Sequence, residues 1–582
     1  MKYDDITIVL GEFGKYQKIL YFLVCLPAIS LGIQMLLPVF SLASQSYRCS
    51  LPGSGTDSFA VRDIDHAIRI NQSIPRKNQD RTSLVYESCE FYYTNENTTY
   101  NEFNVPINAS VVSCNSWVYD QSTFQKTVIT EFDLVCGQEL ARANANMAIM
   151  AGLLVGSLED ADPKDLRGSS DPFQVDKESS YLLEGAWITG DGSHFPYTDQ
   201  EDQREPNTVL HTTENTNMIA NISPRLGLII DRGNILFMDN ASNDTPTTVQ
   251  GMELVGPSYR VAAGVIVEFF WCTGLFILCL VAFFVRSWNY LQLAMACPTV
   301  LLLLLYRLPE SPRWLMSKGR FEEARVVLQK CAKVNGVTLP DDIVGNDTLE
   351  TGESHSVLKI LTVPRLLVRT LIIYLNWIVV NMVYYGLSLN VGNLSGDIYV
   401  NFAINSFFEF AAYGMCLLLL NRVGRKWLHS GSMILGGAAC LSTIFTVLYA
   451  NENQHWITVM LANIGKFGIS AAFGIIYVWT AELFPTVVRS SGVGSSTMMG
   501  RVGSMLCPYI VEIGTIIKGD FGKALALIIF GSMAFIAGLL SLLLPETRGT
   551  VLPETIKDAE NFGRIMKPPV ADIVLQDDET GL

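Results

Sequence analysis

The sequence predicts an all-α protein that crosses a membrane many times. Hydrophobic residues make up 49% of the 582 residues and charged residues only 17%, and the mean hydropathy is +0.28. Apolar runs of about 20 residues, the length that a helix needs to cross a bilayer, recur along most of the chain. The formal net charge of −15 argues against nucleic acid as a partner. Together these observations predict a polytopic helical bundle.

About ten spans are predicted from the apolar runs. In chain order they cover residues 19–43, 143–158, 261–285, 289–306, 370–391, 398–420, 428–450 and 457–483, a run that starts near 490, and 523–544. The first span contains Pro27 and Pro38, which membrane helices tolerate because neighbouring groups satisfy the freed backbone.

Lysine and arginine gather in alternate polar segments, which predicts that these segments lie in the cytoplasm. The cationic residues are Arg307, Arg313, Lys318, Arg320 and Arg325 in one segment, and Arg422, Arg425 and Lys426 in another. Segments 1–18, 307–369 and 545–582 are therefore expected on the cytoplasmic side. Between them lie two spans at 252–306 and a six-span bundle at 370–544.

The long polar loop 44–139, within the segment 19–158 that holds the first two spans, is expected outside the cell. It contains four cysteines, Cys49, Cys89, Cys114 and Cys136, and three N-glycosylation sequons, at Asn71, Asn97 and Asn108. An even set of cysteines together with sequons is typical of an oxidising compartment. Three disulfide pairings are open, and four free thiols are the alternative.

Residues 159–251 differ in character from the rest of the chain. They are rich in Asp, Glu, Asn, Thr and Pro, and their one apolar run, 226–238, is interrupted by Asp231, Arg232 and Asn234. No part of this stretch is apolar enough to span a bilayer. By the count of spans it is expected in the cytoplasm.

Two permanently charged residues lie deep inside predicted spans. Lys466 is about ten residues into its span, and Arg501 is about eleven residues, or roughly 16 Å, into the next. A cation at the middle of a bilayer costs at least about 2.5–3.5 kcal/mol, so it usually faces a watery cavity or an anionic partner and marks a solute pathway. A structural ion pair with a neighbouring helix is the alternative.

Several motifs resemble those of a known family. They are ELVGPSYR at 253–260, LPESPRWLMSKGRFEEA at 308–324, NRVGRK at 421–426, AELFPTVVR at 481–489, RVGS at 501–504 and LPETRGTVLPETIKDAENFGR at 544–564. The chain resembles the organic cation and carnitine transporters of the major facilitator superfamily, including the organic cation transporter-like proteins of insects. The resemblance covers nearly all of the chain except residues 159–251.

The resemblance implies twelve spans, of which the third and fourth have no counterpart here because residues 159–251 stand in their place. The Asp-Arg-x-Gly-Arg-Arg turn of the family is missing with them. One hypothesis is that the chain is a variant transcript, retained non-coding sequence or faulty gene model of a family transporter. The other is a divergent protein with a cytoplasmic insert.

The candidate substrate-binding residues are ionisable or aromatic residues inside the spans: Arg501, Lys466, Glu409, Tyr384, Tyr385, Phe473 and Tyr477. Aromatic faces can hold a quaternary ammonium by cation–π attraction, although packing or contact with lipid explains each ring equally well. Further aromatic residues recur at Tyr374, Trp377, Phe407, Phe408 and Trp479. The resemblance makes Arg501 informative, because cation carriers of the family have an acidic residue there and carnitine and anion carriers a basic one.

Candidate gating residues follow from the resembling motifs. They are Asn421, Arg422, Gly424, Arg425, Glu310, Arg313, Glu482 and Arg489. Arg422 and Arg425 can reach the carbonyls at helix ends or acidic partners and so hold the two halves together when the cavity faces outward. The family usually has Asp at Asn421, which weakens this expectation.

The resemblance implies a secondary transporter of small organic ions that works by alternating access in the plasma membrane. We find no Walker motif, no zinc-ligand spacing and no histidine cluster, so neither an enzyme nor a metal or cofactor is expected. Coupling to Na⁺ or H⁺ is open, with Glu268 and Glu409 as carboxylates inside predicted spans. The alternative function is a transport-inactive variant or a regulatory membrane glycoprotein that lacks two spans. The oligomeric state is not predicted.

Overall fold

The computed structural model describes most of the chain. The described residues are 3–51, 57–76, 86–93, 98–101, 105–107, 109–159, 255–302, 312–317, 320–338, 363–394, 396–449, 454–485, 488–517, 520–550, 553 and 555–562. One compact unit comprises Met1–Val155 and Asn240–Leu582, and a second comprises Gly156–Asp239. The predicted cytoplasmic insert 159–251 therefore lies, apart from Glu159, outside the described residues.

Ten helices of the first unit coincide with the predicted spans. They are α2 (Lys15–Leu36), α6 (Leu140–Glu159), α10 (Arg260–Phe284), α11 (Trp288–Leu302), α15 (Pro364–Leu389), α16 (Ile398–Val423), α17 (Arg425–Tyr449), α18 (His455–Leu483), α19 (Arg489–Ile516) and α20 (Asp520–Ser541). Among the described residues, seven segments are long and apolar enough to cross a membrane, and α6, α11 and α19 are not among them. The helical fold class is confirmed, while the number of spans stays a prediction.

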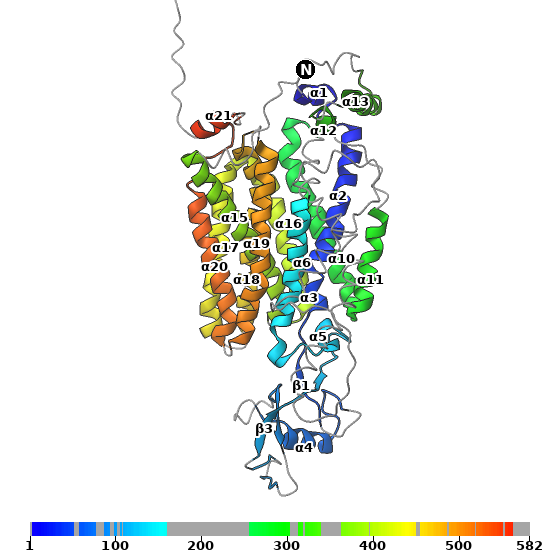
Figure 1. Cartoon of the computed structure of the whole chain (residues 1–582), viewed down its shortest axis with the longest axis vertical. Helices are drawn as coiled ribbons and strands as arrows, with labels where there is room; N and C mark the ends of the chain where they lie inside the picture. Colours follow the sequence, from blue (N-terminus) through cyan, green and yellow to red (C-terminus); the bar gives the residue numbers. More distant parts are fainter. Residues whose placement is uncertain are drawn as a thin grey trace, which may run out of the picture. The chain divides into compact units, whose positions relative to one another are not determined.

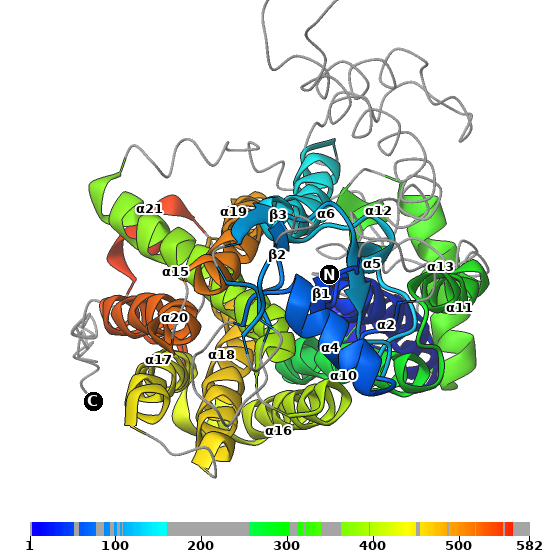
Figure 2. The ribbon, with the colours of Figure 1, turned by 90° about the horizontal axis from the view of Figure 1, so that it is seen from below.

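The long helices pack in two groups (Figures 1 and 2). In the C-terminal group, α17 packs against α18 and α20, and α15 packs against α19. In the N-terminal group, α2 packs against α10 and α11. Helix α16 contacts both α18 and α10, so it joins the two groups.

Glycine allows two of these helix pairs to approach closely. A Cβ atom added at Gly274 of α10 would lie 2.2 Å from the carbonyl oxygen of Ile29 in α2. A Cβ atom at Gly503 of α19 would lie 2.0 Å from the carbonyl oxygen of Ile378 in α15. Small residues at such contacts are the usual means by which membrane helices pack.

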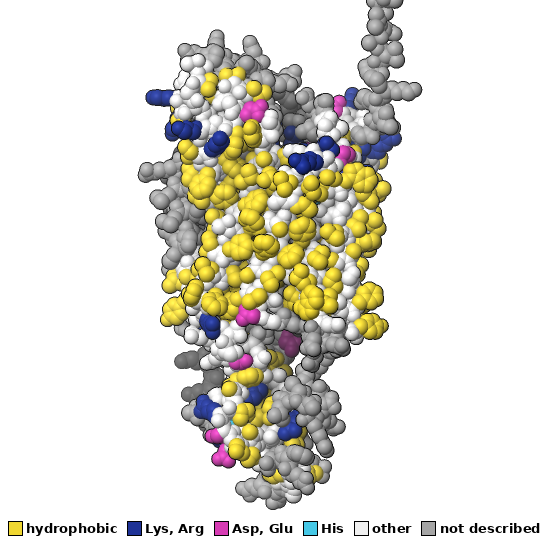
Figure 3. Space-filling view, turned by 180° about the vertical axis from the view of Figure 1, so that it is seen from behind, with side chains coloured by type: hydrophobic (Ala, Val, Ile, Leu, Met, Phe, Trp, Pro, Cys, Tyr) yellow, Lys and Arg dark blue, Asp and Glu magenta, His cyan; other side chains and the backbone are white. Residues whose placement is uncertain are grey.

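Large hydrophobic side chains cover the outside of the long helices. Leu280, Phe284, Leu418, Phe445 and Leu543 are each more than 60% exposed. Figure 3 shows hydrophobic side chains over the middle of one face, with Lys and Arg side chains near its upper margin. An apolar belt of this kind fits a bilayer and not water.

The loop 44–139 forms a small disulfide-bonded domain, called the disulfide domain below. Its described elements are β1 (Tyr47–Cys49), α4 (Ile64–Ser73), β2 (Glu90–Tyr93), β3 (Ser110–Ser113), β4 (Trp117–Tyr119), α5 (Val128–Glu131) and the short 3₁₀ turn at Cys136–Gln138. Strand β1 pairs antiparallel with β4, and β2 pairs antiparallel with β3. Disulfides join Cys49 to Cys114 and Cys89 to Cys136, so the alternative of four free thiols is wrong.

One of the three predicted glycosylation sites lies within the described residues. The Asn71 side chain is half-buried. Its Oδ1 accepts hydrogen bonds from Tyr86 Oη at 2.9 Å and from Arg76 at 3.1 Å. Asn97 and Asn108 lie outside the described residues. Glycosylation therefore stays a prediction.

A buried ionic cluster holds the disulfide domain together. The Arg48 guanidinium forms two hydrogen bonds to the Asp57 carboxylate, at 2.7 and 2.9 Å. The backbone N–H of Arg62 donates to His66 Nδ1, so Nε2 carries the hydrogen that His66 donates to Asp57 at 2.9 Å. Burial alone would raise the pKa of Asp57, but the hydrogen bonds from Arg48, Leu51 N–H and His66 outweigh it and hold that pKa below its usual range.

Short helices lie at the opposite end of the long helices (Figure 1). They are α1 (Tyr3–Val9), α12 (Pro312–Ser317), α13 (Phe321–Asn335) and α21 (Ile556–Asn561), while α3 (Pro38–Ser41) continues α2 at the end near the disulfide domain. Asn335, the last residue of α13, donates to Leu10 O and Gln17 Oε1 and accepts from Tyr16 N–H. This side chain ties α13 to both α1 and α2.

The Asp57 cluster makes a prediction for stability. Asp57→Asn leaves Arg48 without its anionic partner, and loss of one partner of a buried ion pair costs about 3–5 kcal/mol. Thermal unfolding of the purified protein should show a lower midpoint, whereas the exposed Asp65→Asn should leave it unchanged. Because the pKa is lower in the folded state, the stabilisation is complete above about pH 4 and is lost as the pH falls below that value. An equal effect of the two variants would contradict this role.

Candidate functional site

A fully buried ion pair lies at the centre of the C-terminal helices. Lys466 on α18 and Glu409 on α16 have no exposed side-chain surface, and Lys466 Nζ lies 3.1 Å from Glu409 Oε2. Of the two readings that the sequence left open for Lys466, the structure shows the anionic partner on a neighbouring helix. The partner is itself one of the predicted site residues.

Tyr384 on α15 binds both charges of this pair. Its hydroxyl donates to Glu409 Oε1 at 2.5 Å, and Lys466 Nζ lies 3.3 Å from the centre of its ring. Trp271 on α10 donates its indole N–H to the Tyr384 oxygen at 2.8 Å. Lys466 also donates to Ser388 Oγ at 2.6 Å. Helices α10, α15, α16 and α18 thus meet at one polar cluster.

The predicted aromatic residues gather around Tyr384. Its ring centre lies 4.9 Å from that of Phe473 and 5.2 Å from that of Tyr385, and Phe473 lies 5.6 Å from Tyr477. Phe407 does not join them, because its side chain is 62% exposed on the outside of α16. We call Lys466, Glu409, Tyr384, Tyr385, Phe473 and Tyr477 the central cluster.

Arg501 lies on α19 at the level of the central cluster. The preceding residue, Gly500, packs against Trp377 and Asn381 of α15, and Asn381 is one helical turn before Tyr384. The Arg501 side chain is half-buried. Glu268 is buried on α10, one turn before Trp271. Both residues therefore lie near the cluster.

The motif residues meet at the end of the bundle opposite the disulfide domain. Arg425 of α17 forms an ion pair with Glu482 of α18 at 2.9 Å, so these two predicted residues lie together. The Glu546 carboxylate accepts from the N–H groups of Arg425 and Lys426 at the start of α17. Thr547 donates to the Glu482 carboxylate.

The other predicted gating residues have different surroundings. The side chains of Asn421 and Arg422 are exposed, and the Arg422 carbonyl accepts a hydrogen bond from Arg548. Gly424 has a positive φ of 103° and lies against the Glu546 carboxylate. Arg489 donates to the Phe484 carbonyl at 3.4 Å.

Glu310 and the Arg313 side chain lie outside the described residues. The contacts described at this end join α16, α17, α18 and α20, which all belong to the C-terminal group. They do not include the expected contact between the two halves, which stays a prediction.

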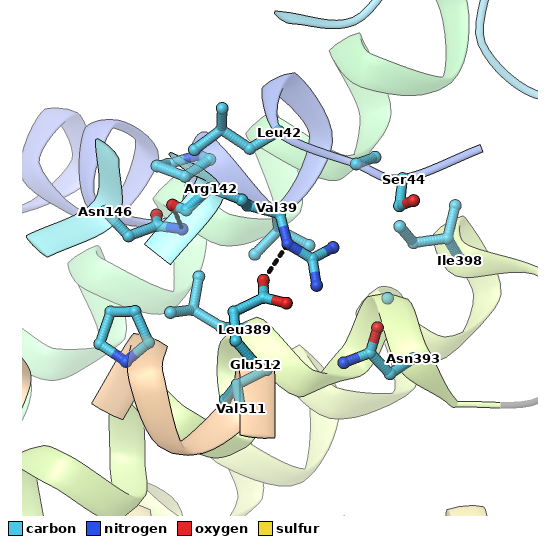
Figure 4. Close-up of a pocket in the computed structure, with 14 residues that line it drawn as sticks. Val39, Leu42, Ser44, Arg142, Asn146, Leu389, Asn393, Ile398, Val511 and Glu512 are labelled. Atoms are coloured by element: carbon cyan, nitrogen blue, oxygen red, sulfur yellow. Dashed lines mark hydrogen bonds and ion pairs between the residues drawn. The ribbon is translucent and has the colours of Figure 1, made fainter. Parts of the chain in front are cut away.

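A pocket lies at the end of the bundle that carries the disulfide domain (Figure 4). Arg142 of α6 and Glu512 of α19 form an ion pair across it, and both side chains are largely buried. Tyr509 of α19 donates to Asn144 of α6 at 2.9 Å. Val39, Ser44, Asn146, Leu389, Asn393 and Ile398 are among the residues that line it. These contacts join α6 to α19 at this end of the bundle.

Arg142 and Glu512 were not among the residues predicted from the sequence. The signal was available, since Glu512 is a second ionisable residue in the span that holds Arg501. The pocket does not include Lys466 or Glu409. Because both of those charges are fully buried, the protein's own side chains fill the central cluster in this conformation.

Comparison with known proteins decides the family. Residues 244–557, more than half of the chain, match the family model described as "Sugar (and other) transporter". The chain is 35% identical to the organic cation transporter protein of Drosophila melanogaster, over 98% of this chain and 96% of that protein. The chain belongs to the organic cation and carnitine transporter family.

Other relatives in this family support the assignment. An organic cation transporter-like protein of Drosophila melanogaster is 33% identical over 99% of this chain and 95% of its own length. The human organic cation/carnitine transporter 2 is 30% identical over 95% of this chain and 93% of its own length. The expected family, the major facilitator fold class and the expectation of a transporter and not an enzyme are confirmed.

The central ion pair predicts that substitutions at Lys466 and at Glu409 have coupled effects on the stability of this transporter family member. Glu409→Gln and Lys466→Met should each destabilise the protein by about 3–5 kcal/mol, because each leaves one buried charge without its partner. The double variant removes both charges, so its loss should be clearly smaller than the sum of the two. Thermal unfolding in detergent measures all three.

A matched control for this cycle is the exposed pair Arg320 and Glu323 on α13. Removing either charge there should change stability by less than about 1 kcal/mol. Additive losses for Glu409→Gln and Lys466→Met would show that the two side chains are not paired in the folded protein.

The pocket between α6 and α19 predicts that Glu512→Gln opens this end of the bundle. The change removes the charge of a bond worth about 1.5–3 kcal/mol, so opening should become at least several-fold more frequent. A cysteine at Asn393 should then react faster with a membrane-impermeant thiol reagent, and Glu90→Gln in exposed β2 should have no such effect. An unchanged rate for Glu512→Gln would rule out this role for the ion pair.

Proposed function

We propose that this protein carries small organic ions, either organic cations or carnitine-like zwitterions and anions, across the plasma membrane by alternating access. The solute binds next to the central cluster, and the two groups of helices rock around it to expose it first to one side and then to the other. The proposal includes neither a cofactor nor nucleic acid as a partner.

The observation that carries this proposal is the contact between an ammonium group and Tyr384. Lys466 Nζ lies 3.3 Å from the ring centre, inside a cluster of aromatic residues and beside Glu409. An aromatic face next to a carboxylate is the chemistry that binds organic ammonium groups. A solute with a quaternary ammonium can therefore use Tyr384, Tyr385 and Phe473 when the bundle opens and Lys466 moves.

Arg501 adds a group that suits a carboxylate. A guanidinium stays charged and can bind a carboxylate through two parallel hydrogen bonds. The preceding residue, Gly500, packs against Asn381, one turn before Tyr384 on α15, which supports a site in which one small molecule reaches both groups. A zwitterion such as carnitine carries both an ammonium and a carboxylate. Two of the relatives named above share this chemistry in part, since one is an organic cation transporter and another an organic cation/carnitine transporter.

A coupling ion is a further part of the proposal. Glu268 is buried on α10, one turn from Trp271, and Glu409 is buried on α16. Carboxylates inside a bundle are the groups that a coupled Na⁺ or H⁺ uses in secondary transporters. Replacing external NaCl by isotonic mannitol, which has no ammonium group and so does not compete for the site, distinguishes the two ions, since only Na⁺ coupling makes uptake fall.

The test is uptake of three labelled solutes by cells that express the chain: carnitine, tetraethylammonium and benzoate. Arg501→Ala removes a charge-assisted bond worth about 1.5–3 kcal/mol, so carnitine uptake at low concentration should fall about ten- to a hundredfold. Arg501→Lys keeps the charge without the paired hydrogen bonds, so its carnitine uptake should lie between those of the wild type and Arg501→Ala. Surface biotinylation shows that the variants reach the plasma membrane.

The matched control is Arg320→Ala, which removes an exposed arginine from α13 and should leave uptake unchanged. Saturable uptake that is lost in Arg501→Ala supports both the carrier and the position of the carboxylate. Uptake of none of the three solutes by protein at the cell surface would contradict the proposal.

A further inference from the structure

A buried histidine lies between three helices of the C-terminal group. His429 on α17 has no exposed surface, and it contacts Asn376 of α15 and the ring of Trp479 of α18. It is neither part of the central cluster nor one of the motif residues. An ionisable side chain in a membrane bundle is costly unless the structure uses it.

The hydrogen bonds of Asn376 fix the state of the imidazole. Asn376 donates its Nδ2 to the Ile372 carbonyl at 2.8 Å, so its Oδ1 is the acceptor that lies 3.2 Å from His429 Nε2. Nε2 therefore carries the hydrogen, and Nδ1 presents a lone pair. Among the described residues, Nδ1 has no hydrogen-bond partner.

Two hydrogen-bond donors on neighbouring residues also lack partners among the described residues: Trp479 Nε1 and Arg425 Nε. The Trp479 ring centre lies 5.3 Å from that of His429. Arg425 is four residues before His429 on α17, and so it lies on the same face of the helix. Each buried polar group without a partner costs about 1–3 kcal/mol.

An acceptor and two donors that lack partners, on neighbouring residues, match the hydrogen bonds that one water molecule makes. A water molecule there can accept from Trp479 Nε1–H and Arg425 Nε–H and donate to His429 Nδ1. The place borders on solvent, because the Arg425 and Glu482 side chains are 9% and 14% exposed while His429 is fully buried. Arg425, the first residue of α17, lies between His429 and the end of the bundle that is predicted to be cytoplasmic.

We propose that His429 is a proton-binding site, reached from this end through water held by Arg425 and Trp479. The proton passes from hydronium to Nδ1, which leaves a neutral water molecule and an imidazolium, and it leaves by the same route. The carbonyl of Ala472 on α18 also lies close to the imidazole. A second N–H on the ring would therefore have an acceptor, as the first has in Asn376.

Binding of a proton at His429 changes the electrostatic interaction with the charged groups around it. They are Arg425 on α17 and Glu482 on α18, which form an ion pair. Glu482 lies one turn after Trp479. Helix α15 presents the uncharged Asn376, and α20 presents Ser541, which bonds to Ser430 beside His429. An imidazolium repels Arg425 and attracts Glu482, so proton binding weakens their pair. The inference does not depend on which solute the protein carries.

The test uses the fluorescence of Trp479, since a protonated imidazole next to an indole quenches its emission. The purified full-length protein is titrated from about pH 8 to about pH 4, the range in which histidines of proteins titrate. Emission should fall with a single-proton curve, and this component should come from Trp479, one of the nine tryptophans of the chain. His429→Asn and Trp479→Phe should each lack this component.

His455→Asn, at the other end of α18, is the matched control and should keep the component. A second measurement needs no variant: a structure that resolves bound water should show a water molecule between His429 Nδ1, Trp479 Nε1 and Arg425 Nε. A titration that is identical in the wild type and His429→Asn would overturn the proposal. So would a water-resolving structure with no water at this place.

Discussion

An ammonium and a carboxylate with no exposed surface, those of Lys466 and Glu409, meet between α18 and α16. Neither charge could lie inside the bundle alone, because the cost of removing an ion from water is several kcal/mol even after the protein relaxes. The requirement to pair them brings α16 and α18 together, and Tyr384 and Trp271 extend the cluster to α15 and α10. Helix α10 belongs to the N-terminal group, so this cluster also joins the two groups of helices.

Further ion pairs stabilise the two ends of the bundle. At one end Arg142 pairs with Glu512 between α6 and α19, which belong to different parts of the chain. At the other end Arg425 pairs with Glu482, and Glu546 caps α17. The first pair joins α6 to α19, whereas the second binds helices of the same group. A carrier needs contacts that can break at each end in turn, and the ion pair between α6 and α19 is suited to such a change.

The sequence predicted what depends on local composition. Apolar runs identify the helices, and the depth of Lys466 in its run identifies a polar centre. It could not show that Lys466 pairs with Glu409, since these residues lie on different helices and only packing brings them together. For the same reason the four cysteines left three disulfide pairings open. The pairing of β1 with β4, which the sequence does not show, brings Cys49 near Cys114.

Other residues had weaker signals or none. Glu512 was not predicted although an acidic residue in a span is itself a signal. His429 gave no signal, since one histidine among small and apolar residues forms no motif. Its role depends on partners that Asn376 and Trp479 provide from other helices.

The central claim is that this chain is a carrier whose solute-binding site is exposed to one side of the membrane at a time. Counter-transport in reconstituted vesicles tests it most directly. Vesicles that contain the purified protein are loaded with labelled carnitine, and efflux is measured with and without unlabelled carnitine outside. Alternating access predicts that external solute accelerates the efflux of the label, because the loaded carrier returns faster than the empty one. Labelled solute that leaves at the same rate in protein-containing and protein-free vesicles, with or without external solute, would contradict the account.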